Sequence, residues 1–90
     1  MEERKFLITA DTGVHARPAT LLVNKASQYS SEVDLHYKEK SVNLKSIMGV
    51  MSLGIPQGAE IRVSTDGNDE EDAIKGIIEI IEEHLGEIKE

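Results

Sequence analysis

The sequence contains no cysteine and only three aromatic residues. Without thiols the chain cannot form a disulfide, a zinc–thiolate site or an iron–sulfur cluster. The scarcity of aromatic rings leaves little for stacking nucleic-acid bases, and a net charge of −7 opposes binding to a phosphate backbone. No apolar run approaches the roughly 20 residues that span a bilayer, and the first residues lack a signal-peptide pattern. We therefore predict a cytoplasmic protein that does not bind nucleic acid directly and does not insert into membranes.

The charge is unevenly distributed along the chain. Residues 66–90 hold ten Asp or Glu and two Lys or Arg, whereas residues 1–65 hold seven and eight, respectively. The acidity therefore belongs to the C-terminal end, and the rest of the chain is close to neutral. A length of 90 residues predicts one small domain over residues 1–90, with a single core.

Hydrophobic periodicity predicts seven secondary-structure elements. Alternation of apolar and polar residues predicts four strands, around residues 6–10, 33–37, 41–44 and 61–65. Helical spacing predicts three helices, over residues 16–26, 47–51 and from about residue 69 onward. The resulting order is βαββαβα. Because each strand is apolar on one side only, we expect an α+β fold of two layers, with helices covering one face of a sheet.

The most informative motif is Gly13-Val14-His15-Ala16-Arg17-Pro18-Ala19, at the predicted start of the first helix. Gly13 permits an unusual backbone turn, and Pro18 is tolerated in a first helical turn. The free N–H groups and the dipole of a helix N-terminus attract anions, and the Arg17 guanidinium suits phosphate oxygens. A lone histidine is more often a surface or capping residue without chemistry. Its neighbours here favour His15 as an acceptor of a phosphoryl group.

The predicted helix at residues 47–51 offers two further candidates, and each has an ordinary structural explanation. Ser46 precedes that helix, so it is either a simple N-cap or a regulatory phosphorylation site, where the helix dipole would stabilise a phosphate. Ile47, Met48 and Met51 cannot all face the core from a helix of two turns. They are either core and scattered surface residues or an adaptable patch for docking a partner.

Other titratable residues give no sign of a metal site or a cofactor. His36 is predicted on the polar face of a strand, and His84 near the end of the last helix, where a basic group matches the dipole. Neither has a neighbouring set of ligands. The acidic run at residues 69–72 lacks the alternating oxygen ligands of a calcium-binding loop. We predict no metal and no cofactor, and read the acidic run as a solvated helix start.

Two motifs give the chain a resemblance to a known family. They are residues 13–19 and the run Asn43-Leu44-Lys45-Ser46-Ile47-Met48-Gly49-Val50-Met51-Ser52-Leu53-Gly54. At this spacing they resemble the HPr family, the histidine-containing phosphocarriers of the bacterial phosphoenolpyruvate:sugar phosphotransferase system, in its Firmicute form. The resemblance spans nearly all 90 residues. It implies an open-faced β-sandwich in which three helices cover a four-stranded antiparallel sheet.

The resemblance also implies roles for the candidate residues. His15 would accept a phosphoryl group on Nδ1 from phosphorylated enzyme I and pass it to enzyme IIA domains for sugar uptake. Arg17 would help to hold and release that group, while the backbone N–H groups of Ala16 and Arg17 would bind its oxygens. Such a protein is not an enzyme. It is a substrate of enzyme I and of a serine kinase, and we expect it to be a monomer.

A second, regulatory role is implied for the other motif. HPr kinase/phosphorylase would phosphorylate Ser46, and that form would act with catabolite control protein A in carbon catabolite repression. The docking surface would include Ile47, Met48 and Met51. Two alternatives stay open: a purely regulatory module in which His15 is idle, and a small nucleic-acid- or metal-binding domain, which the charge and composition disfavour. If both helices begin on one side of the molecule, phosphate on Ser46 should slow phosphorylation of His15.

Overall fold

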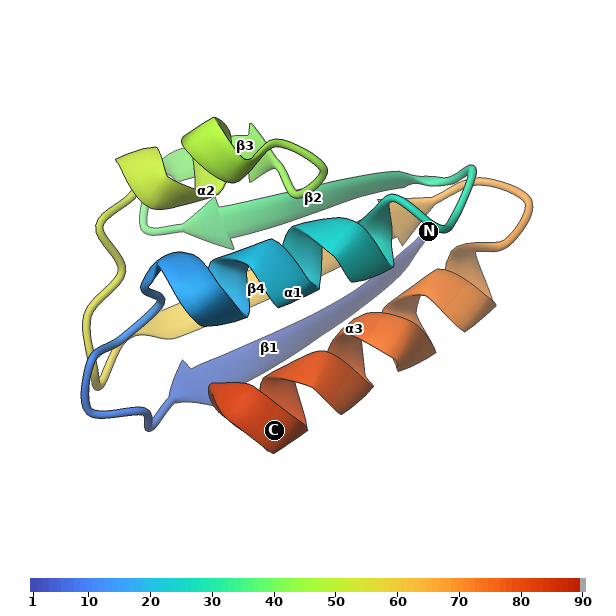
Figure 1. Ribbon diagram of the computed structural model, residues 1–90. Helices are drawn as coiled ribbons and strands as arrows, with labels where there is room; N and C mark the ends of the chain where they lie inside the picture. The colour runs from blue at the N-terminus through green and yellow to red at the C-terminus, as the bar shows by residue number, and fades with distance from the viewer. Residues whose placement is uncertain (90) are drawn as a thin grey trace.

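The computed structural model describes residues 1–89 and consists of an open sheet with helices on one face (Figure 1). Neighbouring strands are all antiparallel, in the order β3-β2-β4-β1-β5. The elements follow one another along the chain as β1 (Glu2–Ile8), α1 (Ala16–Ala26), β2 (Glu32–Tyr37), β3 (Lys40–Asn43), α2 (Ile47–Ser52), β4 (Glu60–Asp66), α3 (Glu70–His84) and β5 (Gly86–Lys89).

The expected fold is confirmed, with corrections to the number of strands and to the first strand, which spans Glu2–Ile8 instead of residues 6–10. The first seven elements follow the predicted order, and the sheet is antiparallel and open on one face. The prediction of four strands is wrong by one, because β5 follows α3 and pairs with β1 at the edge of the sheet. Gly86 allows this pairing, since a Cβ at that position would overlap the carbonyl of Leu7. The run Gly86-Glu87-Ile88-Lys89 holds a single large apolar residue, so it shows no alternation that would predict a strand.

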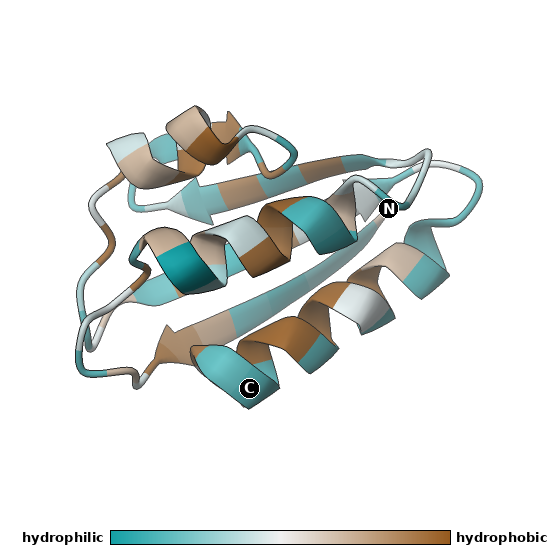
Figure 2. Cartoon of the chain, viewed as in Figure 1, coloured by the Kyte–Doolittle hydropathy of each residue, from teal (hydrophilic) through white to brown (hydrophobic). Residues whose placement is uncertain are grey.

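The core lies between the sheet and the helices. Alternate strand residues face the helices, whose apolar sides are turned toward the sheet (Figure 2). Burying each large aliphatic or aromatic side chain contributes about 1.5–3 kcal/mol relative to leaving it in water. The largest buried side chains are Phe6, Ile8, Leu22, Leu35, Leu44, Ile61, Ile74, Ile77, Ile81, Leu85, Val33 and Val50. Within residues 1–89, none of the helices combines the length and apolar character required to cross a membrane.

Asp69 connects the start of α3 to the turn that follows α1. Its carboxylate accepts hydrogen bonds from the hydroxyl of Ser31 and from the backbone N–H groups of Ser30 and Ser31, both at 2.9 Å. These bonds, that of the Ser31 hydroxyl foremost, lower the pKa of Asp69 to about 2. The acidic start of α3, expected to be solvated only, therefore includes one carboxylate that joins two segments of the fold.

The two loops beside the N-terminus of α1 are joined through their backbones. The N–H of Val14 donates to the carbonyl of Ile55 at 3.0 Å, and Gly13 just before it has a φ of +65°. A Cβ on Gly13 would overlap the Ile55 carbonyl and approach the backbone of Pro56. The N–H of Gly58 donates to Ile8 at 2.8 Å. Close backbone approach and a left-handed φ together require glycine at position 13.

Gly13→Ala should destabilise the protein by about 2 kcal/mol or more, because it adds steric overlap to the cost of a left-handed residue. Gly54→Ala is a matched control. Gly54 has a φ of +58°, but a Cβ there meets no atom within 4 Å. Gly54→Ala should therefore cost only about 1 kcal/mol. Urea unfolding of both variants measures the difference, and equal losses would show that the contact between the loops does not hold the start of α1.

Candidate functional site

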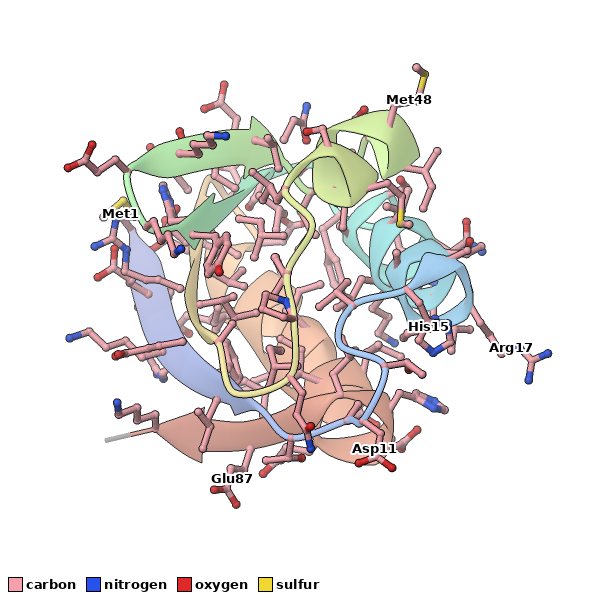
Figure 3. All side chains as sticks on the ribbon, turned by 90° about the vertical axis from the view of Figure 1, so that its left-hand side faces the viewer. Met1, Asp11, His15, Arg17, Met48 and Glu87 are labelled. Atoms are coloured by element: carbon pink, nitrogen blue, oxygen red, sulfur yellow. The ribbon has the colours of Figure 1, made fainter. Side chains whose placement is uncertain are left out.

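His15 is the N-cap of α1, and its imidazole does not cap the helix. Its backbone is extended, with φ of −94° and ψ of −177°, and its side chain forms no capping hydrogen bond. Its carbonyl accepts the N–H of Ala19 at 3.0 Å, which closes the first turn of the helix. The residue is exposed, and Figure 3 shows its ring beside the start of α1. The imidazole is therefore accessible to a reaction partner.

The first turn of α1 offers backbone donors next to this ring. The N–H groups of Ala16 and Arg17 lie too early in the helix to have an intrahelical acceptor, and Pro18 has no N–H. No acidic residue occupies this turn, so no carboxylate competes for the donors. Together with the positive end of the helix dipole, they form a place for an anion.

The guanidinium of Arg17 is exposed and extends into solvent, away from the ring of His15 (Figure 3). Within residues 1–89 it forms no ion pair. The structure thus places both residues at the same helix start but does not direct one side chain at the other. A rotation about the side-chain bonds of Arg17 is needed before it can contact a group bound at His15.

A shallow depression lies between the candidate residues and the next turn of the helix. His15, Ala16 and Arg17 line it together with Thr20 and Leu21, two residues that the sequence analysis did not single out. Thr20 lies four residues after Ala16, on the same helix face, and its hydroxyl donates to the Ala16 carbonyl at 2.8 Å. The i,i+4 spacing from Ala16 is therefore the feature of the sequence that places Thr20 beside the candidate residues.

Ser46 is the N-cap of α2, as expected from its place in the sequence. Its backbone is extended, and its Oγ accepts the N–H of Gly49 at 3.1 Å. The residue is exposed, so its hydroxyl can be reached from solvent. Among residues 1–89, no group of three or more His, Asp or Glu side chains is arranged to hold a metal ion.

Three apolar side chains of α2 are exposed and together form what we term the α2 patch: Ile47, Met48 and Met51. Their exposed fractions are 38%, 82% and 41%, respectively. Val50, from the same helix, is only 1% exposed and belongs to the core. Core packing therefore does not account for the three residues of the α2 patch, which lie at the surface. Figure 3 shows Met48 projecting from α2 into solvent.

α1 and α2 pack side by side and run in opposite directions. In Figure 1, α1 begins at the left of the view, whereas α2 ends there. The two helices therefore do not begin on one side of the molecule, so the condition set for the slowing of His15 phosphorylation by a phosphate on Ser46 is not met.

Comparison with known proteins identifies the family. The family model described as the phosphorylation site of the phosphotransferase-system HPr component matches residues 2–83. A mycoplasma histidine-containing phosphocarrier protein is 41% identical, with a TM-score of 0.89 over 91% of this chain and 93% of that one. An HPr from Thermoanaerobacter tengcongensis is 49% identical, with a TM-score of 0.87 over 91% and 92%. Crh, a catabolite-repression protein of Bacillus subtilis described as a swapped dimer, is 38% identical, with a TM-score of 0.73 over 94% and 98%.

These matches extend over almost the whole length of both compared chains, and they agree with the fold described above. They also agree with the resemblance that the two sequence motifs indicated. The chain belongs to the HPr family, the phosphocarrier proteins of the phosphoenolpyruvate:sugar phosphotransferase system.

Proposed function

We propose that this phosphocarrier accepts its phosphoryl group on Nδ1 of His15 from phosphorylated enzyme I and passes it to an enzyme IIA domain. The observation that supports this most strongly is the exposed imidazole at the N-cap of α1, which forms no capping hydrogen bond. A ring nitrogen with no structural role can act as a nucleophile. The role of the ring is thus to carry the group, while enzyme I and the enzyme IIA domain supply the catalysis.

The N-terminus of α1 then stabilises the negative charge of the transferred group. As the bond from Nδ1 to phosphorus forms and the bond to the donor breaks, the phosphoryl oxygens come to lie beside the N–H groups of Ala16 and Arg17. Phosphoryl transfer depends mainly on positioning and charge stabilisation, which these donors provide. Arg17, directed into solvent in the free protein, turns toward the oxygens once they are present. Its mobility also allows the group to leave.

His15→Ala should abolish phosphorylation by enzyme I and phosphoenolpyruvate, because it removes the accepting nitrogen. Intact-mass analysis of the wild type should show one acid-labile phosphoryl group, and the variant none. Thr20→Ala is a suitable control, since it changes a neighbour in the same depression and leaves the imidazole. An acid-labile group on the His15→Ala variant would contradict the assignment.

We propose that Ser46 is a second, regulatory phosphorylation site, used by HPr kinase/phosphorylase, and that the modified form acts with catabolite control protein A. Its exposed hydroxyl and its place at the N-cap of α2 support this. A phosphate there is compatible with the helix, since it sits at the positive end of the dipole. It would add negative charge at the edge of the α2 patch and so act on partner docking.

Incubation with the serine kinase and ATP should add one acid-stable phosphoryl group to the wild type. The same addition should occur in His15→Ala, because the two sites are separate. Ser46→Ala should lose it entirely. Ser52→Ala serves as a control, as Ser52 is an exposed serine in the same helix. Acid-stable labelling that persists in Ser46→Ala would place the regulatory site elsewhere.

The α2 patch is the surface that we propose for docking enzyme I, because its apolar side chains are exposed on a helix that packs against α1. Met48→Ala should leave stability nearly unchanged, since Met48 is 82% exposed. It should cost about 1 kcal/mol of binding, roughly a fivefold rise in the KM of enzyme I. Ile88→Ala is the control, an exposed apolar residue on β5 outside the patch. Equal effects of the two substitutions in steady-state kinetics would exclude a specific patch.

The similarity to Crh favours one alternative, a purely regulatory module that acts through Ser46 alone. The two functions differ in what His15 does. If enzyme I fails to label the wild type while the kinase labels Ser46, the regulatory alternative stands. The expected monomeric state stays a prediction.

A further inference from the structure

The open face of the sheet presents a row of basic residues. Lys89, Lys5, Arg62 and His36 are successive cross-strand partners on β5, β1, β4 and β2. Directly opposed residues of antiparallel strands project from the same face. This face is the one turned away from the helices, because the neighbouring residues on the strands, such as Phe6, are buried beneath them.

Directly opposed residues of this row do not stabilise one another, and within residues 1–89 the ion pairs on this face are those of Lys89 with Glu60 and of Arg62 with Glu3. Like charges placed directly opposite each other on adjacent strands are destabilising, and Lys5 faces both Lys89 and Arg62. The chain has 17 acidic and only 10 basic residues, so basic residues placed opposite one another do not follow from its composition. A row of basic residues in an acidic protein points to use by an anionic ligand.

The row borders a hollow of about 610 Å³ between the open face and the loop before β4. Its lining includes the cations Lys5, Lys38 and Arg62, the ring of His36, and one carboxylate, Glu60. Glu60 already pairs with Lys89 at 3.1 Å, from outside the hollow. The hollow therefore has more positive than negative charge, and it is open to solvent.

Two of the three cations have no partner of opposite charge within residues 1–89. Lys5 and Lys38 form no ion pair there, and Arg62 approaches Glu3 at 3.4 Å through a pair that is largely exposed to water. An exposed pair of this kind contributes little and is readily exchanged for a better acceptor. All three cations are thus available to an anion that enters the hollow.

The backbone of Lys38 is a second and independent sign. Its φ is +55°, the single non-glycine residue with positive φ in residues 1–89. The β2–β3 turn would accept glycine or asparagine there more easily. Its Nζ lies 5.3 Å from the centre of the Tyr37 ring, which holds the ammonium group at the rim of the hollow. A strained residue whose side chain lines a pocket suggests a functional role.

We propose that this hollow binds a small polyanion with phosphate or carboxylate groups, at a site separate from His15. Arg62 can bind two oxygens through its planar guanidinium, while Lys5 and Lys38 act as point charges on either side. No residue of the helix start lines the hollow. Binding here does not depend on whether His15 accepts a phosphoryl group.

Residue-resolved NMR titration at constant ionic strength tests this proposal. Inorganic pyrophosphate and citrate are the two probes, with sodium chloride as the reference. Saturable shifts should appear at residues 5, 36–38 and 57–62. Shifts with pyrophosphate alone identify a phosphate site, with citrate alone a carboxylate site, and with both a general polyanion site. The absence of saturation with either probe, or shifts confined to residues 15–17, would overturn the proposal.

Matched variants distinguish a specific binding site from non-specific electrostatic attraction. Lys38→Gly removes one cation and leaves a residue that adopts the left-handed turn without cost, so folding is not at risk. It should raise the Kd of the bound probe at least fivefold, and Arg62→Gln should do the same. Lys75→Gln removes one exposed cation from α3, outside the hollow, and should leave the Kd unchanged. Unchanged affinity in Lys38→Gly, or equal weakening in Lys75→Gln, would refute a specific site.

Discussion

The backbone contact between Val14 and Ile55 is the constraint on which the candidate site depends. It ties the segment that precedes α1 to the segment that follows α2. Gly13 makes the contact possible, because only a residue without a Cβ fits against the Ile55 carbonyl with a positive φ. The contact sets the position at which α1 begins. It therefore leaves His15 extended at the N-cap, with its ring outside the helix.

A site of this kind is built mainly from backbone. The donors that we propose to face a phosphoryl group at His15 are N–H groups of the first helical turn, and their positions follow from the helix itself. The core beneath α1 keeps the helix in place, through residues such as Ala19 and Leu22. Side chains at the site, Arg17 above all, are then free to move without loss of the binding geometry. Donors fixed by the helix backbone and an exposed arginine side chain suit the transfer that we propose for His15.

Segregation of charge allows an acidic protein to keep surfaces that attract anions. Acidic residues are concentrated at the start of α3 and along its exposed side, while none lies in the first turn of α1. The open face of the sheet holds the row of basic residues on its four adjoining strands. Because exposed charges are screened beyond about 10 Å at moderate ionic strength, local composition matters more than the net charge.

The sequence alone determined the three helices, the order of the first seven elements, and the positions of His15 and Ser46 at helix starts. These features depend on short-range periodicity and on glycine, proline and serine at helix ends. Only the tertiary structure decided the rest. β5 exists because Gly86 fits against Leu7 across the sheet, and the direction of α2 against α1 follows from packing. Likewise Lys5, Arg62 and His36 come together through strand register. Such contacts join residues far apart along the chain, so no local sequence pattern predicts them.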